Sequence, residues 1–350
     1  MAAQPDSLTQ RLVRTILADG PISLSDFMGQ SLAHYYATRD PLGVDGDFTT
    51  APEISQMFGE MIGLWMAVVW QSIGAPNPVI VTELGPGRGT LMADLLRAAS
   101  LVPAFQDAIK ICLVETSPTL RAYQRRKLDG YTVQWAERVE DIPSGPLLGI
   151  ANEFFDALPI EQFVQRKTGW HLRRVGLDPQ GGFTLVDGEP VSLPFDDSIG
   201  SIREVCPEGQ RLAAHLGHRL ATEGGALLVV DYGYGISQSG DSLQAVKNHA
   251  FHPVLETPGD ADLTTHVDFQ ALASSAIPAR AYGVVDQGDF LKSLGIETRF
   301  QLLAANKPPN VAEGLRAGMR RLIDKDAMGT LFKAMALAHP AYPPPPGFDR

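Results

Sequence analysis

A glycine-rich stretch beside a short apolar run is the part of this sequence best suited to bind a small molecule. Residues 79–84 read Val-Ile-Val-Thr-Glu-Leu and run directly into Gly85, Gly87 and Gly89. This order predicts a strand, a tight turn and then a helix over 90–99, because glycine allows positive φ and leaves the backbone bare. Backbone N–H groups at such a helix start favour a nucleotide-like ligand.

Three residues around this turn narrow the choice of ligand. A dinucleotide-binding turn prefers Gly or Ala where this chain has Thr90. Glu83 stands just before the turn, where it would repel a pyrophosphate and attract a sulfonium or ammonium group. Glu115 ends the predicted strand 109–115, where a carboxylate can accept hydrogen bonds from both ribose hydroxyls. Together these residues favour S-adenosylmethionine and leave an NAD-dependent enzyme as the weakest alternative.

Two more cofactor contacts are expected beside these residues. Thr116 directly follows Glu115, and Trp135 ends the predicted strand 131–135, where its ring could flank an adenine or belong to the core. Simpler roles exist for the two carboxylates as well. Glu83 could be an exposed strand-end residue, and Glu115 could cap the helix predicted over 117–128.

The composition is typical of a globular protein and excludes some classes of partner. The chain has 350 residues, of which 44% are hydrophobic and 20% charged. Its net charge of −11 argues against binding to nucleic acid or anionic membranes. Cys112 and Cys206 are the only cysteines, so we expect a reducing compartment, no disulfide framework and no metal site.

Targeting and membrane segments are not expected. The N-terminus lacks the apolar core of a signal peptide, and Asp6 and Asp19 do not suit a transit peptide, so we expect a cytoplasmic location, as in a bacterial protein. The apolar run 57–73 is interrupted by Glu60 and is short for a membrane span. It predicts a buried helix.

Strands alternate with helices through the middle of the chain, which predicts an α/β fold with a parallel sheet covered on both faces. The expected strands are 79–84, 109–115, 131–135, 147–152, 226–231 and 280–285. They define a Rossmann-like core over 76–160 and 205–300.

Three further regions surround this core. Residues 1–75 predict an N-terminal helical region that could act as a lid or contact the substrate. Residues 161–204 contain short alternating runs joined by glycine turns, which predict a β-rich insertion. Residues 301–350 predict C-terminal helices and a Pro-rich tail, which from Pro340 onward is expected to be an irregular surface segment.

Several long motifs occur together and in one order across about residues 8–335. They are Gly46–Glu60, Glu83–Thr90, Ala151–Pro159, Asp231–Tyr234, Asp262–Phe269 and, more weakly, Gln287–Gly295. In these motifs the chain resembles the MidA family, which includes a mitochondrial complex I assembly factor with arginine methyltransferase activity. The resemblance implies a class I S-adenosylmethionine-dependent methyltransferase fold and a protein substrate such as a respiratory complex I subunit.

The resemblance also implies positions for cofactor residues. It places Gly85 and Gly87 under the methionine part, Glu115 under the ribose, and Asn152 at the substrate end of the fourth strand. Gly89 completes the turn. These residues join Glu83, Thr116 and Trp135 as the expected cofactor site.

Catalytic candidates are the side chains able to hold an arginine for in-line methyl transfer, in which the protein mainly positions the acceptor. Carboxylates suit a guanidinium, and Glu153 follows the predicted strand 147–152 with Asp156 three residues later. His266 lies in a polar loop and could be a general base. Asp156 could instead form a turn or helix cap, and His266 could be a structural hydrogen-bonding residue.

Substrate contacts are expected from polar residues of the 46–60 segment and from the end of the 226–231 strand. They are Thr49, Thr50, Glu53, Gln56, Asp231 and Tyr232. The leading hypothesis is a methyltransferase that acts on protein arginine. The alternatives are an assembly chaperone that binds the cofactor without turnover and a methyltransferase for a small molecule.

Overall fold

The computed structural model describes residues 6–38 and 50–348, which separate into two compact units. The first, here called the core unit, takes its residues from the ranges 49–155, 210–235 and 269–350. The second, the accessory unit, takes its residues from 1–48, 156–209 and 236–268. Residues 236–268 fall inside the predicted core range 205–300 but belong to the accessory unit.

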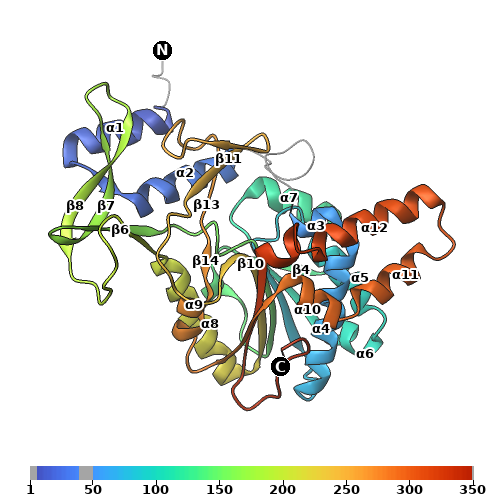
Figure 1. The fold of residues 1–350 in the computed structure, drawn as a ribbon. Helices are drawn as coiled ribbons and strands as arrows, with labels where there is room; N and C mark the ends of the chain where they lie inside the picture. Colours follow the sequence, from blue (N-terminus) through green and yellow to red (C-terminus); the bar gives the residue numbers. More distant parts are fainter. Residues whose placement is uncertain (1–5, 39–49, 349–350) are drawn as a thin grey trace. The chain divides into compact units, whose positions relative to one another are not determined.

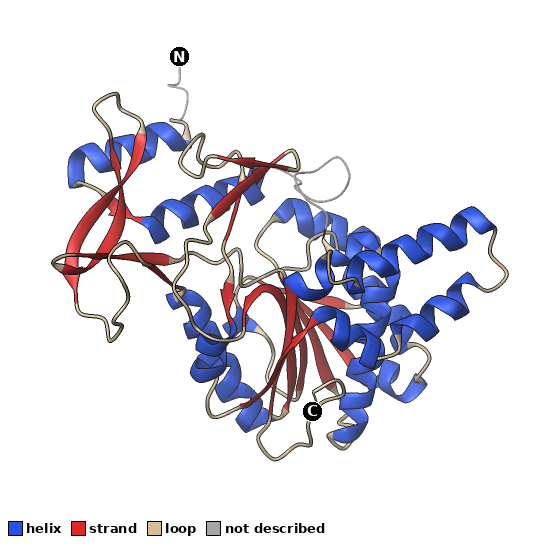
Figure 2. Cartoon of the chain, in the orientation of Figure 1, coloured by secondary structure: helices blue, strands red, loops and turns tan. Residues whose placement is uncertain are grey.

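A mixed β-sheet organises the core unit, with strand order β15-β16-β10-β5-β2-β3-β4 (Figures 1 and 2). The pairs from β4 to β10 are parallel, whereas β16 is antiparallel to both of its neighbours. The predicted α/β, Rossmann-like fold is therefore confirmed. The strands are β2 (Val79–Leu84), β3 (Ile109–Val114), β4 (Val133–Ala136), β5 (Leu147–Asn152), β10 (Gly225–Tyr234), β15 (Arg280–Asp286) and β16 (Phe332–Ala338).

Helices cover both faces of this sheet. Figure 1 shows α4 (Gln56–Ser72) and α5 (Thr90–Ala99) on one face and α8 (Pro207–Glu223) and α9 (Phe269–Ser275) on the other. Every residue of β2 and of β5 is buried as a result, which explains why both strands are mostly apolar, with polar residues only near their carboxyl ends. The remaining helices are α3 (Ala51–Ile54), α6 (Pro103–Ala108), α7 (Pro118–Lys127), α10 (Gln287–Ser293), α11 (Ile296–Ala304), α12 (Pro309–Ile323), α13 (Met328–Leu331) and a 3₁₀ turn over Val139–Asp141.

Helix α4 is the buried helix predicted from the apolar run 57–73. It packs closely on α5 at Gly63, where an added Cβ would lie only 2.5 Å from the carbonyl oxygen of Leu95. Of the helices in the described residues, none has the length and apolar character needed to span a membrane.

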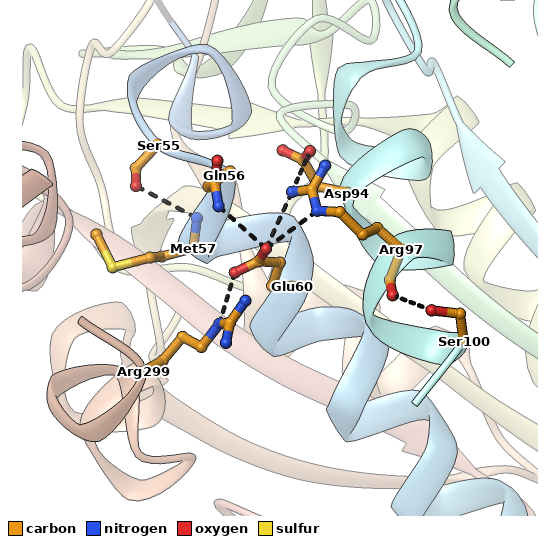
Figure 3. A network of polar contacts seen from close by, with 8 residues as sticks. All are labelled: Ser55, Gln56, Met57, Glu60, Asp94, Arg97, Ser100 and Arg299. Carbon is orange, nitrogen blue, oxygen red and sulfur yellow. Dashed lines mark hydrogen bonds and ion pairs between the residues drawn. The ribbon is translucent and has the colours of Figure 1, made fainter. Parts of the chain in front are cut away.

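The buried negative charge of Glu60 in α4 is paired with arginines from two other helices (Figure 3). Glu60 is buried, and its carboxylate forms ion pairs with Arg97 at 3.0 Å and with Arg299 at 2.8 Å. The Gln56 Nε2 also donates to Glu60 at 3.2 Å. The glutamate that interrupts the apolar run therefore joins α4, α5 and α11.

The C-terminal region differs from the prediction in two respects. Residues 332–338 form β16 between β10 and β15, although Phe-Lys-Ala-Met-Ala-Leu-Ala consists mostly of good helix formers. The Pro-rich tail is irregular, as predicted, but it joins the core. Phe348 is buried beside Phe290 at a ring distance of 5.2 Å, and Trp65 Nε1 donates to the Pro346 carbonyl at 3.1 Å. Proline removes a backbone donor, but the segment still accepts hydrogen bonds and buries side chains.

The accessory unit contains the β-rich insertion and the first two helices of the predicted N-terminal helical region, whereas α3 and α4, which also fall in the range 1–75, belong to the core unit. An antiparallel sheet of order β1-β7-β6-β9, with β8 paired to β7, packs with α1 and α2 around a small apolar core. A second sheet has the order β12-β11-β13. The elements are α1 (Leu8–Asp19), β1 (Ile22–Ser23), α2 (Leu24–Thr38), β6 (Glu161–Arg166), β7 (Gly169–Leu177), β8 (Phe183–Val191), β9 (Ile202–Val205), β11 (Gln244–Lys247), β12 (Ala250–His252), β13 (Asp262–Thr264) and β14 (Val267–Asp268).

Candidate cofactor and acceptor site

The glycine turn between β2 and α5 has the conformation expected from the sequence. Gly85, Gly87 and Gly89 have φ angles of +65°, +52° and +80°, which side-chain-bearing residues rarely adopt. A Cβ on Gly85 would lie 3.1 Å from the Phe154 ring, and one on Gly89 would lie 3.4 Å from the Gln124 Cα. The turn therefore presents bare backbone at the start of α5.

A buried glutamine joins this turn to the next two strands. The Gln124 Nε2 donates to the Gly87 carbonyl at 2.8 Å and to Glu115 Oε2 at 3.2 Å. Its Oε1 accepts a hydrogen bond from Trp135 Nε1 at 2.8 Å. One side chain thus connects the turn, the end of β3 and the end of β4.

Sequence reasoning did not identify Gln124. The available signal was its position between Leu120 and Leu128, since the three residues recur every four positions along α7. All three are buried, so the glutamine lies on the apolar stripe of an otherwise basic helix. A polar residue on such a stripe needs a buried partner.

Glu115 lies at the end of β3 and is nearly buried. Its Oε1 accepts a hydrogen bond from the Ser117 N–H at 2.8 Å, so it supports the first turn of α7, and the Thr116 N–H bonds to the same carboxyl group. Burial raises the pKa of Glu115, and these hydrogen bonds together with that from Gln124 oppose the rise. A carboxylate has about four acceptor positions, and these three hydrogen bonds leave about one of them for a ribose hydroxyl.

Glu83 is a buried residue of β2, two positions before the first glycine of the turn. It is 3% exposed, and burial raises its pKa to about 8, with a smaller contribution from the charge of Glu115 and an opposing hydrogen bond from the Met92 N–H. Within the described part of the chain, Glu83 Oε2 has no hydrogen-bond partner. A cationic ligand group would satisfy this oxygen and favour the ionised carboxylate.

Asn152 and Glu153 lie at the end of β5, on the same sheet edge. The Asn152 Nδ2 donates to Glu153 Oε1 at 3.2 Å, and its buried Oδ1 has no partner among residues 6–38 and 50–348. Glu153 has a φ of +49°, an uncommon conformation for a residue other than glycine. Its Oε1 also accepts a hydrogen bond from the Ala51 N–H at 3.2 Å.

The short helix α3 brings a second carboxylate to the turn. Thr90, the first residue of α5, donates its hydroxyl hydrogen to Glu53 Oε1 at 2.6 Å. Ala51 of the same helix donates to Glu153, so α3 connects the start of α5, through Glu53, with the end of β5, through Glu153. Thr50 is the half-buried N-cap residue of α3.

Asp231 and Tyr232 lie at the end of β10. Asp231 is fully buried, and its two oxygens accept hydrogen bonds from the Phe155 N–H at 3.1 Å and the Tyr232 N–H at 3.0 Å. It therefore ties β10 to the segment after β5. The Tyr232 ring packs edge-on against Phe332 at 5.4 Å. Their roles as substrate contacts remain predictions.

Three of the four other candidates lie in different surroundings. The Asp156 carbonyl accepts a hydrogen bond from the Thr265 N–H at 3.0 Å, and the His266 N–H donates to Ser242 Oγ at 2.9 Å, all within the accessory unit. Burial lowers the pKa of His266. Gln56 contacts Glu60, as described above. Thr49 lies outside the described residues, and the roles of all four remain predictions.

The chemistry of this site matches one cofactor. A buried carboxyl with an unpartnered oxygen suits the cationic methionine part of S-adenosylmethionine, a hydrogen-bonded carboxylate suits a ribose, and the glycines leave room for close approach. A pyrophosphate would meet Glu83 instead of a cation. In the described residues, no three His, Cys, Asp or Glu side chains cluster as metal ligands.

Comparison with known families supports this assignment. A family model described as an S-adenosyl-L-methionine-dependent methyltransferase matches residues 61–285. The chain belongs to this methyltransferase family. The resemblance to the MidA family is thereby confirmed, the enzyme class is S-adenosylmethionine-dependent methyltransferase, and the cofactor is S-adenosylmethionine.

Curated relatives and solved structures resemble nearly the whole chain. The zebrafish (Danio rerio) "Protein arginine methyltransferase NDUFAF7, mitochondrial" is 35% identical, with 96% of this chain and 87% of the relative covered. The human (Homo sapiens) protein of that name is 34% identical, with 94% and 83% covered. A Burkholderia thailandensis protein crystallised with S-adenosyl-homocysteine has a TM-score of 0.81 and 25% identity, with 100% and 96% covered.

These relatives contradict one expectation from the sequence. The chain was expected to be a cytoplasmic bacterial protein, because its N-terminus lacks the features of a signal or transit peptide. The zebrafish and human relatives are both named as mitochondrial proteins, so that expectation is wrong. Composition near one terminus was too weak a basis for it.

Proposed function

We propose that this methyltransferase transfers a methyl group to an arginine side chain of a protein. The observation that carries the proposal is the pair of hydrogen bonds by which α3 connects Glu53 with Thr90, directly after the glycine turn, and Ala51 with Glu153, at the end of β5. An arginine guanidinium is a delocalised cation with several N–H donors, and paired carboxylates bind it in a defined orientation. The relatives named protein arginine methyltransferases support the same acceptor.

The roles of the residues follow from methyl-transfer chemistry. S-adenosylmethionine supplies an electrophilic methyl group on a sulfonium when bound. Hydrogen bonds from Ala51 and Asn152 hold Glu153 in one orientation. Glu153 and Glu53 would orient the guanidinium so that one nitrogen is in line for attack, and Glu153 would accept the proton which that nitrogen loses. Asn152 would lie where cofactor and acceptor meet.

The remaining candidates complete the proposal on the acceptor side. Asp156 and His266 would act as further acid–base or substrate residues, and Thr49, Thr50, Gln56, Asp231 and Tyr232 as substrate contacts. By the resemblance to the MidA family, the protein substrate is a subunit of respiratory complex I. Each of these roles is tested by the same assay.

The decisive experiment is transfer of a labelled methyl group. The chain is incubated with methyl-labelled S-adenosylmethionine and purified complex I subunits, and labelled proteins are hydrolysed to identify methylated amino acids. We expect label in methylarginine, and a large loss with Glu153→Gln at unchanged cofactor affinity. Label confined to small molecules, or cofactor binding without any transfer, would refute the proposal in favour of the alternatives.

A further inference from the structure

Gln124 makes hydrogen bonds to three separate segments of the cofactor site. We propose that Gln124 is a positioning residue for S-adenosylmethionine, which fixes Glu115 and Trp135 against the glycine turn. It would act through those residues, which we expect to contact the ribose and flank the adenine. The cofactor site does not depend on which acceptor is methylated, so failure of arginine methylation would leave this proposal intact.

The orientation of the Gln124 amide follows from the chemistry of its partners. The Trp135 indole nitrogen can only donate, so Oε1 must face it at 2.8 Å. Both amide hydrogens are then directed to the Gly87 carbonyl at 2.8 Å and Glu115 Oε2 at 3.2 Å. The side chain is fully buried, so losing the amide would leave buried groups unsatisfied.

The three hydrogen-bond partners of Gln124 come from different elements. Gly87 belongs to the turn after β2, Glu115 follows β3, and Trp135 lies in β4 with the guanidinium of Arg125 4.9 Å from its ring centre. Helix α7 also lies close to the turn, since a Cβ on Gly89 would meet the Gln124 Cα at 3.4 Å. The side-chain amide of Gln124 therefore sets the spacing of three segments of the site before the cofactor binds.

The same amide tunes the charge of Glu115. Its hydrogen bond helps to hold the pKa of Glu115 down against the effect of burial. Arg121 on α7 acts in the same direction, and Glu83 on β2 lies near enough for the charge of Glu115 to raise the pKa of Glu83. Replacing Gln124 by an apolar residue should therefore raise the pKa of Glu115, while Arg121 and Glu83 remain in place.

The test compares Gln124→Met with Gln134→Met, because both replace glutamine by an apolar residue of similar size. Gln134 is exposed and directly precedes Trp135. We expect Gln124→Met to weaken S-adenosylmethionine binding about tenfold or more, since it removes hydrogen bonds to a charged group and to buried backbone. Gln134→Met should bind within about twofold of the unaltered chain, as surface substitutions usually have small effects. Calorimetry measures both affinities.

Two readouts separate positioning from general destabilisation. In Gln124→Met, affinity should fall on acidification at a higher pH than in the unaltered chain, because Glu115 protonates earlier. The fluorescence of Trp135, obtained by difference from Trp135→Phe, should shift in Gln124→Met and not in Gln134→Met. Unchanged affinity and an unchanged pH profile in folded Gln124→Met would overturn the proposal.

A second variant covers the case in which Gln124→Met does not fold. Gln124→Glu keeps the size of the side chain and an acceptor oxygen for Trp135 Nε1, and it removes the amide donor to the Gly87 carbonyl and Glu115 Oε2. We expect it to weaken S-adenosylmethionine binding by about threefold or more, because the turn and Glu115 then lose that donor. Affinity equal to that of the unaltered chain would count against a positioning role for Gln124.

Discussion

The carboxylate of Glu153 accepts a hydrogen bond from the backbone N–H of Ala51 at 3.2 Å, which joins the end of β5 to α3. The same glutamate has a φ of +49°, a conformation that costs a residue with a Cβ about 1 kcal/mol. A glycine would fit this backbone with less strain. Strained residues of this kind gather at functional sites, which agrees with the proposed role of Glu153 in holding the acceptor.

Replacing Glu153 by glycine should separate stability from activity. The change relieves the strain but removes the hydrogen bonds from Ala51 and Asn152, so we expect the unfolding temperature of Glu153→Gly to differ little from that of the unaltered chain. Methyl transfer to protein should fall by about a hundredfold or more, because the acceptor loses a positioning carboxylate. Thermal unfolding and initial rates measure the two effects, with cofactor affinity checked by calorimetry.

Asn306 supplies the matched control for this prediction. It has a φ of +64° and lies on the surface between α11 and α12. Asn306→Gly should give a similar relief of strain and leave methyl transfer unchanged. If Glu153→Gly retained its full rate, Glu153 would have no part in acceptor binding.

The buried carboxylate of Glu60 should make a measurable contribution to stability. Its side chain is 2% exposed, whereas its partners Arg97 and Arg299 are 49% and 28% exposed. Breaking fully buried pairs costs about 3–5 kcal/mol, and the exposure of both arginines reduces the figure for Glu60→Gln to about 2 kcal/mol. Urea unfolding measures the loss. Glu313→Gln, which removes the exposed pair with Arg316, should cost less than about 0.5 kcal/mol.

Two glycine-to-alanine changes in helices should have opposite effects on stability. A Cβ on Gly63 would lie 2.5 Å from the Leu95 carbonyl oxygen, so Gly63→Ala must push α4 and α5 apart and should cost about 1–3 kcal/mol. Gly314 in α12 has nothing within 4 Å of that position. Gly314→Ala should therefore stabilise the helix by up to about 1 kcal/mol. Equal unfolding free energies for the two variants would show that α4 and α5 do not pack this closely.

Local patterns were sufficient to predict most of the core unit. The runs 79–84 and 147–152 are β2 and β5 with the same bounds, because a strand buried on both faces needs a mostly apolar sequence. The glycine turn was predicted for a similar reason, since three closely spaced glycines after a strand leave few other conformations. Glu83 and Glu115 were singled out as candidates because each stands at the end of a predicted strand.

Features that depend on distant contacts were not predicted. Strand β16 consists of residues that favour helices, and it forms a strand because β10 and β15 offer hydrogen-bonding edges on both sides. Gln124 carries no local mark of its three partners, which come from separate segments. The burial of Phe348 likewise depends on Phe290, which is far away in the sequence.

Glu83 should make both stability and cofactor binding depend on pH. Burial raises its pKa from 4.5 to about 8, so the folded chain holds this proton more tightly than the unfolded chain. The free energy of unfolding without cofactor must therefore fall as the pH rises from about 4.5 to about 8. Glu83→Gln should remove this contribution. Unfolding midpoints across that range, compared between the two chains, test the prediction.

The same proton should leave when the cofactor binds. If the cationic methionine part lies beside Glu83, binding favours the carboxylate, so the carboxyl group must release a proton below pH 8. Calorimetry at pH 7 in two buffers of different ionisation enthalpy measures that release. We expect the binding enthalpy of the unaltered chain to differ between the buffers by more than that of Glu83→Gln. An identical buffer dependence in the two chains would place the cation away from Glu83, and the unpartnered oxygen would then need another explanation.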